Sequence, residues 1–203
     1  MIKILLKTKL FFVILTIGSV LKADPYSLAN ISQYLTNLKF LKADFLQTSA
    51  DGTASSGAIL IKRPGRMRFE YYKPDKTLVL ISSGALAIFD PKGDEEPVTY
   101  PIKNNPISLV LTGEVDLLNS GIVENYEKNI EEAVLTIRDP KRPERGSVEL
   151  VFTGAKPELK RFSIKNENGS STSILLNDIE YPKKINETLF SISLEINKRK
   201  NRN

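Results

Sequence analysis

The chain has 203 residues, 41% hydrophobic and 26% charged, which is the balance of a globular protein. It contains no Cys, His or Trp. The absence of Cys excludes disulfides, thiolate zinc sites, a Cys nucleophile and a lipid-modified N-terminal Cys, while the absence of His removes the commonest general base and metal ligand.

The net charge of +5 comes from the two ends of the chain. Residues 1–23 carry four Lys and no acid, and residues 198–203 carry four cations and no acid, which leaves 21 basic and 24 acidic residues between them. The body of the protein therefore has no basic footprint, and we expect no nucleic-acid partner. Residues 198–203 are expected to form a frayed, solvated tail.

Residues 1–23 predict a signal peptide. Three Lys precede the apolar run from Leu10 to Val20, and the small residue Ala23 follows. The eleven residues of this run span about 16 Å of helix, roughly half of a bilayer core. An uncleaved anchor is the alternative. No repeat or linker divides residues 24–203, so we expect one exported domain.

A helix is predicted directly after this segment, with Asp24 as its cap and Pro25 at its first position. One apolar face recurs at helical spacing through Leu28, Ile31, Leu35 and Leu38.

From residue 40 onward, alternating apolar and polar residues predict strands. Asp51-Gly52 and Asn166 to Gly169 predict turns, the second of them a hairpin. Because the connections are too short for parallel crossovers, the sheet should be a mostly antiparallel meander. The predicted strands cover residues 43–47, 67–71, 78–81, 85–89, 133–137, 148–152, 162–164, 171–179 and 190–196.

One region interrupts the strands. Between Pro101 and Gly121, the apolar segments Ile107–Leu111 and Val115–Leu118 predict one or two short helical turns. Short apolar helices inserted in a sheet serve either as a plug or as a lid.

No catalytic motif is present. There is no Gly-x-Ser-x-Gly elbow, phosphate-binding loop or dinucleotide fingerprint, and we expect no enzyme activity, cofactor or metal. Two alternatives stay open: a hydrolase with paired carboxylates, and a structural envelope protein that takes up no acyl probe. The pattern as a whole favours a carrier of apolar molecules.

Arg63 is the most distinctive polar residue. Pro64 restricts it to extended geometry and Gly65 permits a sharp turn, so its planar guanidinium could reach several carbonyl oxygens. An ordinary exposed strand end is the alternative interpretation.

Several segments, in order, resemble the LolA family of periplasmic outer-membrane lipoprotein carriers, over roughly residues 27 to 195. The Lys-Arg-Pro segment, followed by the aromatic strand and the Pro-containing turn, is the most specific part. The matching segments are Phe45-Leu-Gln47, Gly57, Ile59 to Arg66, Arg68-Phe-Glu-Tyr71, Lys73-Pro74, Leu80 to Gly84, Ile88 to Pro91, Arg161 to Ile164, and Leu189-Phe190.

The resemblance implies a mainly β fold with short helices: a single curved antiparallel sheet that forms an incomplete barrel, with a helical lid over an apolar cavity. It also implies a monomeric periplasmic carrier, which accepts acylated lipoproteins from an inner-membrane ABC transporter and passes them to an outer-membrane receptor of similar fold. That receptor is itself a lipoprotein, so a chain without Cys cannot be the receptor. A carrier or sensor of other lipids is the alternative within this fold.

The resemblance also implies roles for individual residues. By motif match, Arg63 hydrogen-bonds the lid backbone and favours closure. The residues expected to bind lipid are Phe45, Met67, Phe69, Val79, Ile81, Phe89, Ile107, Leu109, Val110 and Leu111.

Overall fold

The computed structural model describes residues 24–91 and 96–201, and the signal peptide predicted over residues 1–23 lies outside them. No helix among the described residues has the length and apolar character needed to cross a membrane. The helices are α1 (Leu28–Asn37), α2 (Ser108–Leu111) and α3 (Ile192–Lys200), with 3-10 turns at η1 (Ile102–Asn104), η2 (Pro143–Arg145) and η3 (Glu187–Phe190). The strands are β1 (Phe40–Thr48), β2 (Ala54–Lys62), β3 (Arg66–Tyr71), β4 (Leu78–Ser82), β5 (Ala85–Phe89), β6 (Val98–Pro101), β7 (Val123–Lys128), β8 (Glu132–Arg138), β9 (Ser147–Thr153), β10 (Glu158–Lys165) and β11 (Ser171–Glu180).

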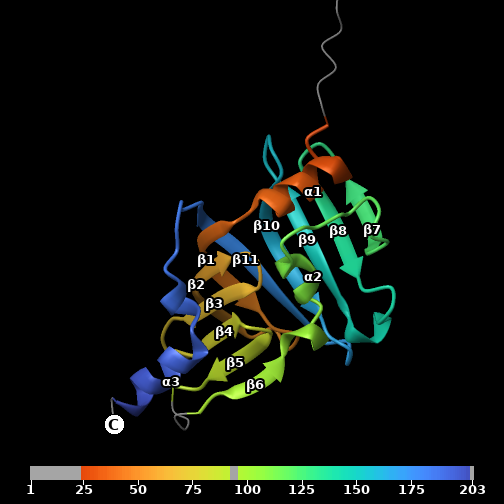
Figure 1. Ribbon diagram of the computed structural model, residues 1–203. Helices are drawn as coiled ribbons and strands as arrows, with labels where there is room; N and C mark the ends of the chain where they lie inside the picture. Colours follow the sequence, from red (N-terminus) through yellow and green to blue (C-terminus); the bar gives the residue numbers. More distant parts are fainter. Residues whose placement is uncertain (1–23, 92–95, 202–203) are drawn as a thin grey trace, which may run out of the picture.

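All 11 strands belong to one sheet, in the order β6-β5-β4-β3-β2-β1-β11-β10-β9-β8-β7, and every neighbouring pair is antiparallel. The chain runs outward from β1 to the edge strand β6, crosses to the other edge at β7, and returns to pair β11 with β1 (Figure 1). Within the described residues the edges β6 and β7 do not pair, so the sheet is open. The predicted antiparallel meander is confirmed.

The crossing segment between the two edges carries α2. One or two helical turns are predicted for the two apolar segments here, and the first segment contains α2. The second, over Val115–Leu118, is a turn in which the Asp116 carboxylate accepts hydrogen bonds from the backbone N–H groups of Leu118 and Asn119, both at 3.0 Å. A short polar side chain that satisfies the backbone locally competes with helix formation.

The first helix begins later than predicted. Its N-cap is Ser27, whose hydroxyl accepts from the backbone N–H of Asn30 at 3.2 Å. Asp24 accepts instead from the N–H of Tyr26 at 3.1 Å, in the turn that precedes the helix. The apolar stripe itself is as predicted, with Ile31 and Leu35 buried.

The main hydrophobic core lies on the inner face of the sheet. Along β1, Leu41, Ala43 and Phe45 are buried while their neighbours face outward, which is the alternation of a half-buried strand. Side chains of α1 and α2 join this core together with those of strands from both halves of the sheet. The two helices therefore cover the inner face (Figure 1).

The strand predicted over residues 190–196 is wrong. Ser191 caps α3 by accepting from the N–H of Leu194 at 3.2 Å, and Leu194 is 49% exposed. Ile192 and Ile196, one helical turn apart, pack on a second apolar cluster that lies on the outer face of the sheet. That cluster consists of Leu78, Leu80, Ala87 and Phe89.

The expected frayed tail is also wrong as far as Lys200, because α3 continues to that residue. The Arg199 guanidinium lies 4.8 Å from the centre of the Phe89 ring and donates to the Asp90 carbonyl at 3.1 Å. Lys200 pairs with Glu96 at 2.7 Å. These contacts hold the basic segment on the outer face of the sheet, while residues 202–203 lie outside the described residues.

Candidate functional site

A small apolar cavity lies between α1, α2 and the inner face of the sheet. Its volume is about 20 Å³, roughly the space that one water molecule occupies. Besides Arg63, it is lined by Leu35, Leu38, Ile61, Met67, Ile107, Val110, Leu111, Leu150, Leu159 and Phe162. The inner face is therefore filled in this structure, and α2 forms one wall of the small space that remains.

Most of the residues expected to bind lipid lie on this inner face. Phe45, Met67, Phe69, Ile81, Ile107, Val110 and Leu111 are buried in the main core, and Val79 and Leu109 are half-buried against it. Met67 and the three buried lid residues line the cavity. Phe45 makes edge-to-face contacts with Phe69 and Tyr71, at centroid distances of 5.5 and 5.1 Å. The structure thus brings nine of these residues together, and their role in binding stays a prediction.

Phe89 is placed differently from the other nine. It pairs with Leu78 across the β4–β5 ladder, and both side chains belong to the outer cluster under α3. Because successive residues of a strand face opposite sides, Ile88 and Leu86 take the inner positions on β5. The expectation that Phe89 lines the lipid cavity is therefore wrong.

This correction can be tested with a matched pair of variants. Phe89→Leu should leave the affinity for a fluorescent fatty-acid probe within about twofold, and should cost about 1 kcal/mol of stability. Phe69→Leu, on the inner face, should weaken the same binding several-fold because it removes apolar contact area. Probe titration and thermal unfolding measure both effects. Equal losses of affinity in two folded variants would contradict the assignment.

Six lining residues of the cavity were not among those expected to bind lipid. Ile61 belongs to β2, and the other five come from α1 and the second half of the sheet: Leu35, Leu38, Leu150, Leu159 and Phe162. The helical stripe and the strand alternation marked four of these five as buried, and Leu159 carried no separate signal. Nothing in the local pattern showed that β9 and β10 face the same cavity as β2 and β3.

Arg63 lies at the end of β2, under the C-terminal end of α2, and it is only 6% exposed. Its Nε and Nη2 both donate to the carbonyl oxygen of Thr112, at 3.1 and 2.5 Å. Thr112 directly follows α2, where carbonyl groups lack donors within the helix. The alternative of an exposed strand end is therefore wrong, and Arg63 contacts the backbone of the segment that covers the cavity.

Further polar contacts anchor the same segment. The backbone N–H of Gly65 donates to the Leu111 carbonyl at 2.8 Å. On the other side, the Ser32 hydroxyl of α1 donates to the Val115 carbonyl at 2.5 Å and accepts from the N–H of Leu117 at 3.1 Å. The lid is thus attached at the β2–β3 turn and at α1 by a small number of hydrogen bonds.

The charge of Arg63 has no carboxylate partner among the described residues. Burial lowers the pKa of its guanidinium to about 10, while the phenol of Tyr34 acts in the opposite direction. The group still carries its charge at neutral pH, because a pKa of about 10 lies well above pH 7. Its interaction with the lid is therefore a charge-assisted hydrogen bond to a neutral carbonyl.

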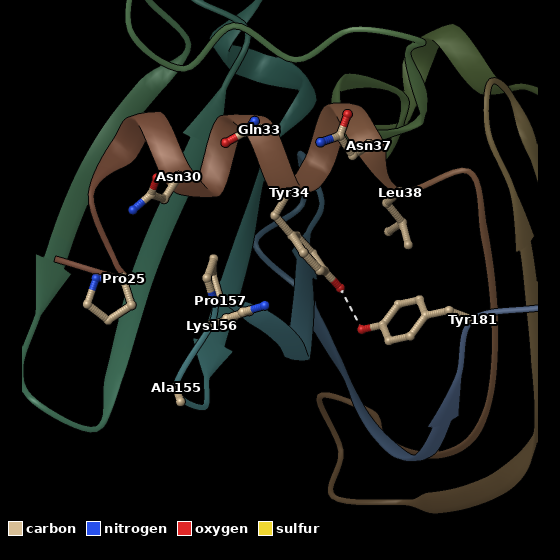
Figure 2. Close-up of a pocket in the computed structure, with 10 residues that line it drawn as sticks. All are labelled: Pro25, Asn30, Gln33, Tyr34, Asn37, Leu38, Ala155, Lys156, Pro157 and Tyr181. Carbon is tan, nitrogen blue, oxygen red and sulfur yellow. Dashed lines mark hydrogen bonds between the residues drawn. The ribbon is translucent and has the colours of Figure 1, made fainter. Parts of the chain in front are cut away.

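A second recess, of about 660 Å³, lies between α1, the turn over residues 155–157 and Tyr181 (Figure 2). The phenols of Tyr34 and Tyr181 meet there at 3.2 Å, and Tyr181 also donates to Glu158 at 3.1 Å. Burial raises the pKa of both phenols. Side-chain amides of α1 and the turn over residues 155–157 complete its lining. It contains none of the residues expected to bind lipid, and it shares only Leu38 with the apolar cavity.

Comparison with known proteins gives consistent matches. The family model described as "Outer membrane lipoprotein carrier protein LolA" matches residues 36–193. An outer-membrane lipoprotein carrier protein from Methylococcus capsulatus is 25% identical over 187 residues, covering 87% of this chain and 88% of that protein. The carrier protein of Dechloromonas aromatica is 29% identical over 170 residues, covering 79% and 80%. A solved LolA superfamily structure from Nitrosomonas europaea aligns with a TM-score of 0.43 at 10% identity, covering 81% of this chain and 97% of that one.

Proposed function

Because the chain belongs to the LolA family of outer membrane lipoprotein carrier proteins, it is a carrier and not an enzyme, and we propose that it holds the acyl chains of lipoproteins between α2 and the inner face of the sheet. The signal peptide expected in residues 1–23 supports a periplasmic location. Within that compartment the carrier would accept its cargo from an inner-membrane ABC transporter and deliver it to an outer-membrane receptor of similar fold.

The contact between Arg63 and the Thr112 carbonyl is the observation that carries this proposal. It attaches the lid over an apolar interior whose free volume is only about 20 Å³. An acyl chain needs far more space than one water molecule, so binding requires α2 to move away from the sheet. Arg63 then acts as a latch for the vacant state.

A latch of this kind makes transfer reversible. An acyl chain of about 15 methylenes gains roughly 12 kcal/mol on leaving water, at about 0.8 kcal/mol for each CH₂. If lid closure did not compete with binding, a carrier that held two or three such chains could hardly release them. Breaking the charge-assisted contact between Arg63 and the lid costs about 1.5–3 kcal/mol. This contact lowers the effective affinity for cargo by favouring the closed state. Transfer would then proceed to a receptor whose pocket is more accessible. It would need no nucleotide bound to this protein.

The absence of Trp allows a direct test of lid opening. A Leu109→Trp variant carries the only Trp of the chain, on α2 at a half-buried position. Its emission should change when a triacylated lipopeptide is added, because α2 leaves the sheet and the indole exchanges its contacts with the core for contacts with acyl chains or water. An unacylated peptide of the same sequence should cause no change.

Leu118→Trp is the matched control, since Leu118 is 60% exposed and does not line the cavity. Its emission should not respond to the lipopeptide. Unchanged emission from Leu109→Trp at saturating lipopeptide would contradict the lid proposal. A response to phospholipid that is stronger than the response to lipopeptide would favour the alternative, a carrier or sensor of other lipids.

A further inference from the structure

The guanidinium of Arg63 has one nitrogen that the latch does not use. In the part of the chain that the structure describes, Nη1 of Arg63 is the buried side-chain nitrogen or oxygen that lacks a hydrogen-bond partner. Arg63 is also the polar member of the cavity lining, whose other ten side chains are all apolar. An orphaned donor of a charged group inside an apolar site calls for an explanation.

The shape of the guanidinium separates the lid contact from the free donor. Its donors lie in one plane, and Nε and Nη2 form one edge of the fork. That edge is occupied by the Thr112 carbonyl. Nη1 lies on the other side of the group and therefore cannot serve the same acceptor. The free donor and the latch are thus two different sides of one side chain.

Water is a poor partner for this donor. A buried water needs about two to four polar partners, and the cavity around Arg63 has room for about one water molecule and walls of Leu, Ile, Val, Met and Phe. The donor consequently stays unsatisfied while the lid is closed, which is costly for a charged group. A ligand that brings an oxygen acceptor into the open cavity would relieve this cost.

We propose that Nη1 of Arg63 is a binding site for a carbonyl oxygen of the cargo, namely an ester carbonyl at the head of an acyl chain. This inference rests on the proposed function, because it assumes that acyl chains enter beneath α2. Esters fit the site because they place one strong neutral acceptor directly beside an apolar chain.

This site would also set the orientation of the cargo. On β2, Gly57, Ile59 and Ile61 share the inner face with Arg63, since they alternate along the strand. A chain whose head is held at Arg63 extends along this row toward the ring of Phe45, over a strand length of about 20 Å. The ester group then lies at the lid end and the terminal methyl group lies at the aromatic cluster.

The test compares a diacylated lipopeptide with its dialkyl-ether counterpart, which has equal chain lengths but no ester carbonyls. Both compete against a fluorescent fatty-acid probe on the full chain. The unmodified protein should bind the ester form about tenfold more tightly or better, as expected for one hydrogen bond to a charged donor. Arg63→Leu should bind the two forms equally. Met67→Leu, which changes another wall of the same cavity, should keep the ester preference.

The outcomes distinguish this inference from the carrier function. An ester-to-ether ratio that is the same in the unmodified protein and in Arg63→Leu would overturn the carbonyl site alone. Failure of the unmodified protein to bind either lipopeptide would overturn the carrier function as well. Should Arg63→Leu not fold, the infrared band of the ester carbonyl decides: a shift to lower frequency on binding to the unmodified protein supports the site, and an unshifted band overturns it.

Discussion

Arg63→Leu is expected to accept acylated lipoprotein and to release it poorly. Without the guanidinium, the Thr112 carbonyl loses both of the donors that Arg63 supplies in the closed state. The two bonds share one acceptor oxygen, so their loss counts as the loss of one charge-assisted contact of about 1.5–3 kcal/mol. This should shift the closed-to-open equilibrium about 10- to 150-fold toward the open state. The cargo then no longer competes with lid closure and stays on the carrier.

The measurement is the rate at which preloaded carrier passes a fluorescent lipoprotein to the outer-membrane receptor. Transfer from Arg63→Leu should be at least tenfold slower than transfer from the unmodified protein. Arg66→Leu is the matched control. Arg66 is the first residue of β3, directly after the same turn, and among the described residues its side chain makes no hydrogen bond to the lid segment. Normal transfer by a folded Arg63→Leu would end the latch proposal.

The two sides of Arg63 act in opposite directions on retention. Loss of the Thr112 bonds favours the loaded state, whereas loss of the Nη1 contact weakens the hold on an ester. An ether-linked cargo experiences only the first effect. The slowing of transfer caused by Arg63→Leu should therefore be larger for ether-linked than for ester-linked cargo, and this separates the latch from the carbonyl site.

Gly57→Ala is expected to be among the most destabilising single substitutions in this protein. A Cβ at this position would lie 2.3 Å from the backbone oxygen of Glu70 and 2.7 Å from the ring of Phe45. Glu70 belongs to β3, which is paired with β2 at this point, so its carbonyl cannot retreat without loss of the ladder. We expect a loss of about 3 kcal/mol or more in the free energy of unfolding.

Urea unfolding followed by circular dichroism measures this loss. Gly113→Ala provides the control, because its Cβ would meet its nearest neighbour, Pro64, at an ordinary 3.9 Å. That substitution should change stability by less than about 1 kcal/mol. Comparable stabilities for the two variants would show that β2 and β3 can separate at Gly57. The aromatic cluster at the proposed methyl end of the cavity would then be less rigid than the structure indicates.

The sequence alone determined the elements whose pattern is local. Alternation along β1 and β3, the helical stripe of α1 and the hairpin from Asn166 to Gly169 reflect contacts between residues close in the chain. Short connections then permitted only an antiparallel meander. The family resemblance added the lid and the role expected for Arg63, and the structure supplies the Thr112 carbonyl as the atom that Arg63 contacts.

Where both faces of a strand or helix are apolar, only the tertiary structure decided which face a given residue takes. Strand β5 has no alternation, so only its register with β4 places Phe89 outward. The C-terminal segment has isoleucines spaced four apart, which satisfies both an alternating strand and one helical turn. The outer cluster, which would be exposed without a covering element, is covered by this segment as a helix. The unpartnered Nη1 of Arg63 likewise follows from the way α1, α2 and both halves of the sheet meet around it. The burial of this nitrogen and its lack of a hydrogen-bond partner depend on residues distant in the chain.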